Sequence, residues 1–230
     1  VAVAPDGTLW LAYHTRRMNR WGIWVARHTG AEGWTESEPI SEGPGTDQAP
    51  AAAVRADGTL WIVWSRYDQG RWRLVARVRD PGGTWGDVFD LGPELGDLPG
   101  DALERKDPAL TVDASGHLWL FWRQRDMERW MLYYSRRSAG AWASPVRFPA
   151  DGGDDPHVES APSVVAPASG PNVLWVAWAR EVSADTPGQT RQVVVVRAKS
   201  TANPDDTGWG GVRTLSTTPP AYHDTDPALY

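Results

Sequence analysis

The chain has 230 residues and a formal net charge of −6, from 23 Lys and Arg against 29 Asp and Glu. This acidic balance argues against non-specific nucleic-acid binding, which needs clustered positive charge. No apolar run reaches the ~18 residues of a membrane span, and the absence of Cys excludes disulfides, Cys-ligated zinc and thiol catalysis. The 15 Trp against 3 Phe indicate packed sheets that use Trp at fixed positions.

A tight turn that leads into an alternating, Trp-bearing strand occurs four times along the chain. The copies are Asp6–Tyr13, Asp57–Trp64, Ser115–Trp122 and Gly170–Trp178. A short strand of small apolar residues, opened by a Pro, is predicted before the last three copies. These strands are Ala49–Val54, Asp107–Val112 and Ala161–Ala166. A unit repeated at this spacing indicates a repeat fold.

Two further strands are predicted after each copy. The third strands of the units are Trp21–Arg27, Trp72–Arg77, Trp130–Arg136 and Gln192–Arg197. The fourth strands open at Gly33-Trp34, Thr84-Trp85, Ala141-Trp142 and Gly208-Trp209. The second-strand tryptophans Trp10, Trp61, Trp119 and Trp175 are 51, 58 and 56 residues apart. Four antiparallel strands at this spacing predict an all-β fold, a β-propeller of four-stranded antiparallel blades.

We expect a single propeller domain over residues 1–230, with blades at about 1–47, 48–106, 107–160 and 161–225. Residues 226–230 would start a further inner strand. Either the four blades close on themselves, with Asp226–Tyr230 near Val1, or the native protein has more blades; the second is favoured because an open arc would expose apolar faces. At most one helical turn is expected, over Leu98–Arg105.

The order of Pro-Ala strand, Asp-Gly-Thr-Leu-Trp strand and Gly-x-Trp strand resembles the sialidase-like propellers with Asp-box (BNR) repeats. The best copy of the Asp box is Asp80–Trp85, with Val78 where the hydroxyl residue should stand. Degenerate copies are Thr29–Trp34, Ser138–Trp142 and Asp205–Trp209. In that family the box is a structural turn remote from the ligand face, so Asp80 is expected to accept hydrogen bonds from its own loop.

Sialidases of that family bind a carboxylate with an arginine triad and use a Tyr/Glu pair with an Asp acid. Their leading landmark, an Arg-Ile-Pro near the start, does not occur in this sequence. The resemblance therefore implies the fold and a glycan-related role more directly than it implies hydrolysis, although the missing site residues could lie in another blade.

Arginines follow the second strands at Arg16, Arg66, Arg123 or Arg125, and Arg180. We expect them on one face of the ring, where guanidinium groups could bind a carboxylate or sulfate. Alternatively, each pairs with an acid of a neighbouring loop, such as Asp47, Asp107, Glu159 or Asp226. Repetition in every unit favours pairing, because binding sites are usually asymmetric.

The same loops carry other candidate residues. Trp21, Tyr67, Trp72 and Trp130 could stack on sugar rings, although packing between blades is favoured. Asp68 and Asp126 are the best-placed acids, with a turn-forming role favoured. Asp151, Asp154 and Asp155 could ligate Ca²⁺, although a solvated loop is favoured because they lack the spacing of a calcium loop. The ligand-binding candidates are therefore Arg16, Arg66, Tyr67, Asp68, Arg123, Arg125, Asp126 and Arg180.

Three functions remain open at this point, in the following order. The first is a non-catalytic module that binds a glycan or a protein on its loop face. The second is a glycoside hydrolase of sialidase type with part of its site elsewhere, and the third is a structural scaffold. Further blades or domains of the parent chain are possible partners, and no catalytic residue, metal or cofactor is assigned. The compartment is open, with an extracellular or cell-surface location favoured.

Overall fold

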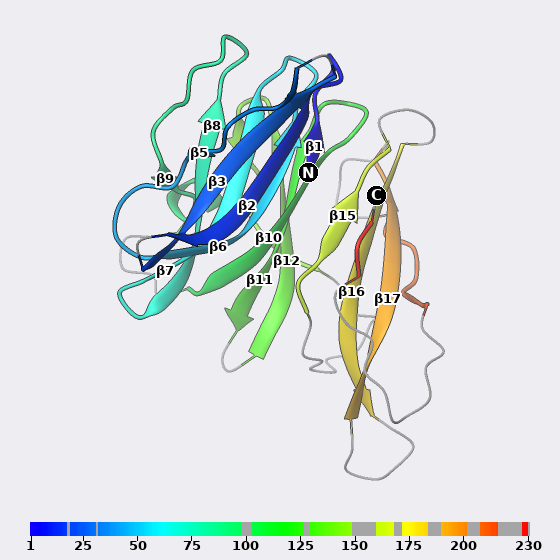
Figure 1. The fold of residues 1–230 in the computed structure, drawn as a ribbon. Coiled ribbons are helices and arrows are strands. Elements are labelled where there is room, and N and C mark those ends of the chain that lie inside the picture. The colour runs from blue at the N-terminus through cyan, green and yellow to red at the C-terminus, as the bar shows by residue number, and fades with distance from the viewer. Residues whose placement is uncertain are drawn as a thin grey trace.

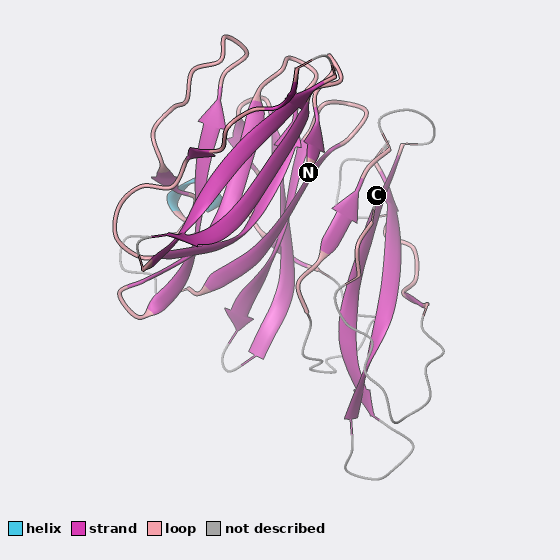
Figure 2. Ribbon diagram, in the orientation of Figure 1, coloured by secondary structure: helices cyan, strands magenta, loops and turns pink. Residues whose placement is uncertain are grey.

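The computed structural model describes residues 1–17, 19–30, 32–97, 103–126, 129–148, 160–167, 172–183, 190–201, 208–215 and 227–229. These residues form four antiparallel sheets that lie side by side (Figure 1). Strands and loops make up almost all of the described chain (Figure 2). The prediction of an all-β propeller of four-stranded antiparallel blades is confirmed.

Each sheet is one blade, and its strands follow one another in chain order. Blade 1 contains β1 (Ala2–Val3), β2 (Leu9–Arg17), β3 (Arg20–Thr29), β4 (Gly33–Trp34) and β5 (Glu38–Pro39), which also pairs with β3. Blade 2 contains β6 (Thr46–Val54), β7 (Leu60–Asp68), β8 (Arg71–Arg79) and β9 (Phe89–Asp90). The third strands expected from the sequence are close to those observed in these two blades, whereas the second strands run four residues beyond the predicted ends at Tyr13 and Trp64. The sequence predicts no first strand for blade 1.

The second half of the chain repeats the arrangement. Blade 3 contains β10 (Arg105–Val112), β11 (Leu118–Asp126), β12 (Arg129–Ser138), β13 (Ala141–Trp142) and β14 (Val146–Arg147), which pairs with β12. Blade 4 contains β15 (Ser163–Val165), β16 (Val173–Ser183), β17 (Thr190–Ser200) and β18 (Arg213–Thr214). The blade boundaries given above stay predictions.

The turns that precede the second strands of blades 1, 2 and 3 are each held by an Asp side chain. In blade 2, the Asp57 carboxylate accepts a hydrogen bond from the Thr59 amide at 2.9 Å, and Gly58 has a φ of 86°. That φ lies in the region that glycine adopts without strain. In blade 3, Asp113 also accepts a hydrogen bond from the indole of Trp119 at 2.9 Å. These local contacts explain why the turn could be predicted from sequence.

Side chains of alternating residues on each second strand face opposite neighbours. Trp64, Trp122 and Trp178 are fully buried in the clusters that join their blades to the preceding ones. Trp61 points the other way, toward blade 3, and is 4% exposed. Trp175, its counterpart in blade 4, is on the face turned away from blade 3 and is 40% exposed.

The fourth strands are less regular than expected. Trp85 and Trp209 form only isolated bridges, with Arg79 and Lys199, and pairing resumes further along at β9 and β18. Most of the segment Leu98–Arg105, where at most one helical turn is expected, lies outside the described residues, and Arg105 itself pairs in β10. A short 3-10 turn, η1 (Pro93–Leu95), lies earlier in the loop.

The first strands of the blades follow one another along the inner side, since β1 contacts β6, β6 contacts β10 and β10 contacts β15. The Leu229 amide donates a hydrogen bond to the Ser163 hydroxyl at 3.0 Å, which places residues 227–229 beside β15.

Because first and second strands are antiparallel, the first strands begin at the end of the propeller where the β2–β3, β7–β8, β11–β12 and β16–β17 hairpins turn. This end is called the loop face below. Within the described ranges, no helix is long and apolar enough to span a membrane.

Candidate functional site

Two β-bulges shape the loop face. The pairing of β6 with β7 shifts between Gln48 and Ala51, and that of β10 with β11 shifts between Lys106 and Ala109. The bulges contain Ala49 and Asp107, with φ angles of 51° and 54°. Each precedes a Pro, and a non-glycine residue with positive φ at such a position is strained. The Asp107 amide donates to the Ser65 hydroxyl of blade 2 at 2.7 Å, which ties the bulge to its neighbour.

Asp47 is the centre of the polar contacts on blade 2. Its fully buried carboxylate accepts hydrogen bonds from the Trp64 indole at 2.9 Å and from Arg66 Nε at 2.7 Å. Arg66 Nη2 reaches the second carboxylate oxygen at 3.0 Å, and Arg20 of blade 1 approaches the same oxygen at 3.5 Å. The buried charge is therefore fully paired, as a buried carboxylate must be.

Blade 3 uses different residues for similar contacts. Arg123 donates to Asp107, with Nε at 2.8 Å from Oδ2, and Arg125 pairs with Glu104 at 2.7 Å. A third pair joins the buried Arg105, which also donates to Gln124, to Asp97. These contacts hold the first strand of the blade to the end of the second.

The arginines expected to be equivalent do not share one register position. Arg66 and Arg180 each stand two residues after a buried Trp, whereas Gln124 holds that place in blade 3 and Thr15 in blade 1. Arg123 is one residue earlier, and Arg16 and Arg125 are one later. Arg16 is exposed and Arg180 is buried with its guanidinium 5.7 Å from the Trp178 ring. The pairing expected with Asp47 and Asp107 is present for Arg66 and Arg123, while Glu159 and Asp226 lie outside the described residues.

A cluster of aromatic side chains surrounds Lys106 at the junction of blades 2 and 3. Its ammonium nitrogen lies 4.4 Å from the Trp130 ring centroid and 5.9 Å from that of Trp72. Tyr67, an exposed residue, has its ring centroid 5.2 Å from that of Trp72. Trp72, Trp130, Tyr67 and Lys106 are called the aromatic clamp below. Of the four aromatics expected on this face, Trp21 lies apart, against His14 in blade 1.

The electrostatics of Lys106 are unusual for a residue on a loop face. Burial lowers its pKa from 10.5, the charge of Arg123 lowers it further, and Asp107 and Glu104 partly oppose the shift. Within the described part of the chain, no carboxylate lies within ion-pair distance of its ammonium group. Sequence reasoning missed Lys106, although it is one of only two lysines in the chain and directly precedes the Asp-Pro-Ala motif.

Of the acidic residues proposed from the sequence as ligand-binding or metal-binding candidates, the structure describes the side chain of Asp68 but not those of the others. Asp68 pairs with Arg73 at 2.6 Å, and Arg73 also reaches Asp90. Asp126 stands opposite Arg129 at the end of β11, but its side chain is outside what the structure describes. Asp151, Asp154 and Asp155 also lie outside the described residues. In the described ranges, no group of three His, Asp or Glu side chains could hold a metal ion.

Asp80 has the turn geometry expected of it. Its carboxylate accepts a hydrogen bond from the Thr84 amide at 2.7 Å, Gly83 has a φ of 95°, and Trp85 packs on Trp10 of blade 1. Trp10 and Trp85 lie at the beginning of β2 and the end of β8, which is the end of the propeller opposite the loop face. Asp80 therefore contributes to the packing of the turn and is remote from the aromatic clamp.

No family model and no curated protein matches the sequence. Several solved structures match the fold. A Hadza microbial sialidase aligns at 14% identity over 93% of this chain and 57% of that one, with a TM-score of 0.56. The GH93 α-L-arabinofuranosidase of Fusarium graminearum aligns at 14% identity over 93% and 64%, with a TM-score of 0.61. The endo-arabinase from Bacteroides thetaiotaomicron aligns at 16% identity over 94% and 84%, with a TM-score of 0.55.

At such identities the likeness shows the fold alone. The chain spans less than two thirds of the sialidase and of the arabinofuranosidase. The three proteins named above are enzymes that act on carbohydrates, and the likeness assigns no activity to this chain.

Proposed function

We propose that the protein binds a glycan through the aromatic clamp of its loop face and does not cleave it. The observation that carries this proposal is the position of Lys106, whose ammonium group lies against two indoles from neighbouring blades. Such a group is a cation held in place by aromatic rings, with N–H donors available for a ligand.

The chemistry of the clamp suits a sugar. The apolar C–H face of a pyranose can stack on an indole or a phenol ring, while ring and hydroxyl oxygens accept hydrogen bonds from an ammonium group. Tyr67 extends the surface next to Trp72. The carbohydrate-active structural neighbours support a glycan as the ligand in preference to a protein.

The described carboxylates nearest the clamp support binding without catalysis. Asp47, Asp107 and Glu104 each accept hydrogen bonds from an arginine. These carboxylates are already acceptors of guanidinium N–H groups, whereas a glycoside hydrolase needs a carboxyl group that can reach the glycosidic oxygen. The pairs therefore suit a structural role better than proton donation.

Hydrolysis is the second candidate function, because the structural neighbours are enzymes and the chain spans only part of two of them. A glycan array followed by calorimetry tests the first candidate, with Trp130→Ala and Lys106→Gln as clamp variants. Each should weaken binding about tenfold, the equivalent of about 1.4 kcal/mol. Trp34→Ala removes an exposed indole of blade 1 and should leave affinity unchanged.

Release of reducing sugar from arabinan, or of fluorophore from a sialoside, separates the two candidates. Turnover that exceeds the buffer rate would establish hydrolysis and contradict a purely binding role. Absence of glycan binding, or glycan binding that both clamp variants retain in full, would refute the clamp as the site. A scaffold would neither bind nor cleave the glycans.

A further inference from the structure

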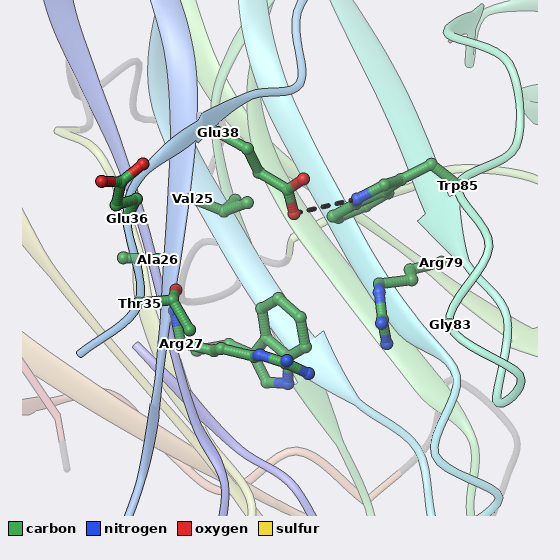
Figure 3. Close-up of a pocket in the computed structure, with 10 residues that line it drawn as sticks. Val25, Ala26, Arg27, Thr35, Glu36, Glu38, Arg79, Gly83 and Trp85 are labelled. Atoms are coloured by element: carbon green, nitrogen blue, oxygen red, sulfur yellow. Dashed lines mark hydrogen bonds between the residues drawn. The ribbon is translucent and has the colours of Figure 1, made fainter. Parts of the chain in front are cut away.

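A polar pocket opens between blades 1 and 2, at the end of the propeller opposite the loop face (Figure 3). Its volume is about 280 Å³. The side chains that define it come from β2, β3 and the loop after it, and the end of β8: Trp10, Arg27, Glu36, Glu38, Arg79 and Trp85. This volume is near the lower end of small-molecule sites and suits a single sugar residue.

Two polar positions of the first junction, between blades 1 and 2, are apolar in the second junction, between blades 2 and 3. Trp10 pairs across the strands with Arg27, whereas the equivalent Trp61 pairs with Val78. Val25 pairs with Glu38, whereas the equivalent residue of blade 2 pairs with Phe89. Two apolar positions of the second junction are thus polar in the first.

The second junction shows what the apolar residues do. The Phe89 ring packs edge-on against Trp61 at 6.2 Å, and Trp142 of blade 3 packs against the same indole at 5.9 Å. In the first junction, Trp85 approaches Trp10 at 6.5 Å, and the carboxylate of Glu38 replaces the phenyl ring. An arginine recurs at the third junction, where Trp119 pairs with Arg136, whereas Val146 stands there in the place of Glu38. The carboxylate of Glu38 is therefore the feature that sets the first junction apart from the other two.

Two guanidinium groups meet at one end of the pocket. Arg27 and Arg79 extend toward the same space from opposite walls (Figure 3), and Trp10 pairs with Arg27 in the register of β2 and β3. Arg79 Cζ lies 5.0 Å from the Trp10 ring centroid. In the described part of the chain, neither guanidinium forms an ion pair or a side-chain hydrogen bond, in contrast to Arg66 and Arg123 on the loop face.

The surrounding chain keeps this end open. Gly83 has a φ of 95°, and a Cβ atom added there would come within 2.7 Å of Arg79 Nη2. The acidic side chains lie away from the two guanidiniums (Figure 3). Glu38 accepts a hydrogen bond from the Trp85 indole at 3.2 Å, so its carboxylate is directed to the far side of the pocket.

We propose that this pocket binds one uronic acid residue, a site separate from the clamp of the loop face. The planar carboxylate of the sugar would lie between Arg27 and Arg79, which match its geometry with paired N–H donors. The sugar ring would stack against the half-buried indole of Trp85, and its hydroxyls would donate to Glu36 and Glu38 at the other end. A neutral hexose lacks the group that the two arginines recognise.

Calorimetric titration of the full chain with glucuronate and with glucose tests the proposal. Glucuronate should bind at least about tenfold more tightly than glucose. Arg27→Val introduces the residue that blade 2 has at the equivalent position, Val78. Arg79→Gln removes the second positive charge. Each variant should weaken glucuronate binding at least about tenfold. Circular dichroism checks that both variants fold.

Arg137→Gln is the matched control. Arg137 takes the place of Arg79 at the second junction, with its Cζ 4.8 Å from the Trp61 ring centroid. Val78 and Phe89 stand there where the first junction has Arg27 and Glu38. The control variant should bind glucuronate like the parent chain, and so should the clamp variant Trp72→Ala. Equal affinity for glucose and glucuronate, or full affinity in Arg27→Val, would overturn the proposal. Loss of glucuronate binding in Trp72→Ala would place the sugar on the loop face and overturn it as well.

Discussion

The buried carboxylate of Asp47 is expected to be the largest single electrostatic contributor to the stability of blade 2. Replacing it by Ala would leave the Trp64 indole N–H and the Arg66 guanidinium without their acceptor at a fully buried position. Removing one partner of a buried ion pair costs about 3–5 kcal/mol, because the remaining charge is uncompensated. The hydrogen bonds are not added to this figure, since they are part of the same interaction.

Two further variants make the reasoning specific to charge. Asp47→Asn retains an oxygen for the Trp64 indole but removes the negative charge, so it should cost less than Asp47→Ala and clearly more than zero. The double variant Asp47→Ala/Arg66→Ala should be more stable than Asp47→Ala alone, because no unpaired charge is left buried. Arg55→Ala, which breaks a largely exposed pair with Asp57 at 3.4 Å, should cost less than about 1 kcal/mol.

Urea unfolding followed by Trp fluorescence and by circular dichroism measures these free energies, with equal m-values required for a direct comparison. Coincidence of the two probes shows whether one two-state transition describes the chain. A cost below about 1 kcal/mol for Asp47→Ala, or a double variant less stable than the single one, would refute the account of this pair.

Two other predictions concern the clamp and the blade junctions. The pKa of Lys106 should lie below 10.5, mainly because the side chain is buried, so Trp130→Ala should raise this pKa by reducing the burial. A ¹³C NMR titration of the methylated chain, which has only two lysines, measures the pKa. A lower pKa in Trp130→Ala than in the parent chain would contradict the assignment. Trp61→Ala should cost about 3–5 kcal/mol of unfolding free energy, whereas Trp175→Ala, at 40% exposure against 4%, should cost less than half as much. Equal costs in urea unfolding would show that burial at the junction does not control stability.

The parts of the fold that depend on neighbouring residues could be predicted from the sequence. The Asp57 turn and the alternation after it involve contacts within a few residues, so the order of strands followed from the repeat. The break in the fourth strand could not be predicted, because Trp85 is held by a single bridge and by packing on the preceding blade. The bulges were also missed, since the Pro-Ala motif does not reveal the positive φ of Asp107.

The candidate site depended on contacts between blades, which the repeat alone does not specify. Lys106 meets Trp72 only because blades 2 and 3 pack together, so the clamp was only partly anticipated through its aromatic members. The arginine positions could have been separated by counting, since Arg66 follows its buried Trp by two residues and Arg123 by one. The polar pocket could have been found in the same way, by comparing Glu38 with Phe89 and Val146.

The two exposed indoles at the ends of the arc give the row of blades a direction. Each internal junction considered above joins a second-strand Trp of one blade to a fourth-strand Trp of the next, as Trp10 joins Trp85 and Trp61 joins Trp142. Trp175 is a second-strand indole and Trp34 a fourth-strand indole, exposed by 40% and 53%. At the third junction the fourth-strand Trp209 packs instead on Phe121, Tyr134 and Phe148 of blade 3. A sheet that stacked on blade 4 in the manner of the first two junctions would bring a fourth-strand Trp to Trp175, and one that stacked on blade 1 would bring a second-strand Trp to Trp34, so the two faces are complementary in a head-to-tail sense.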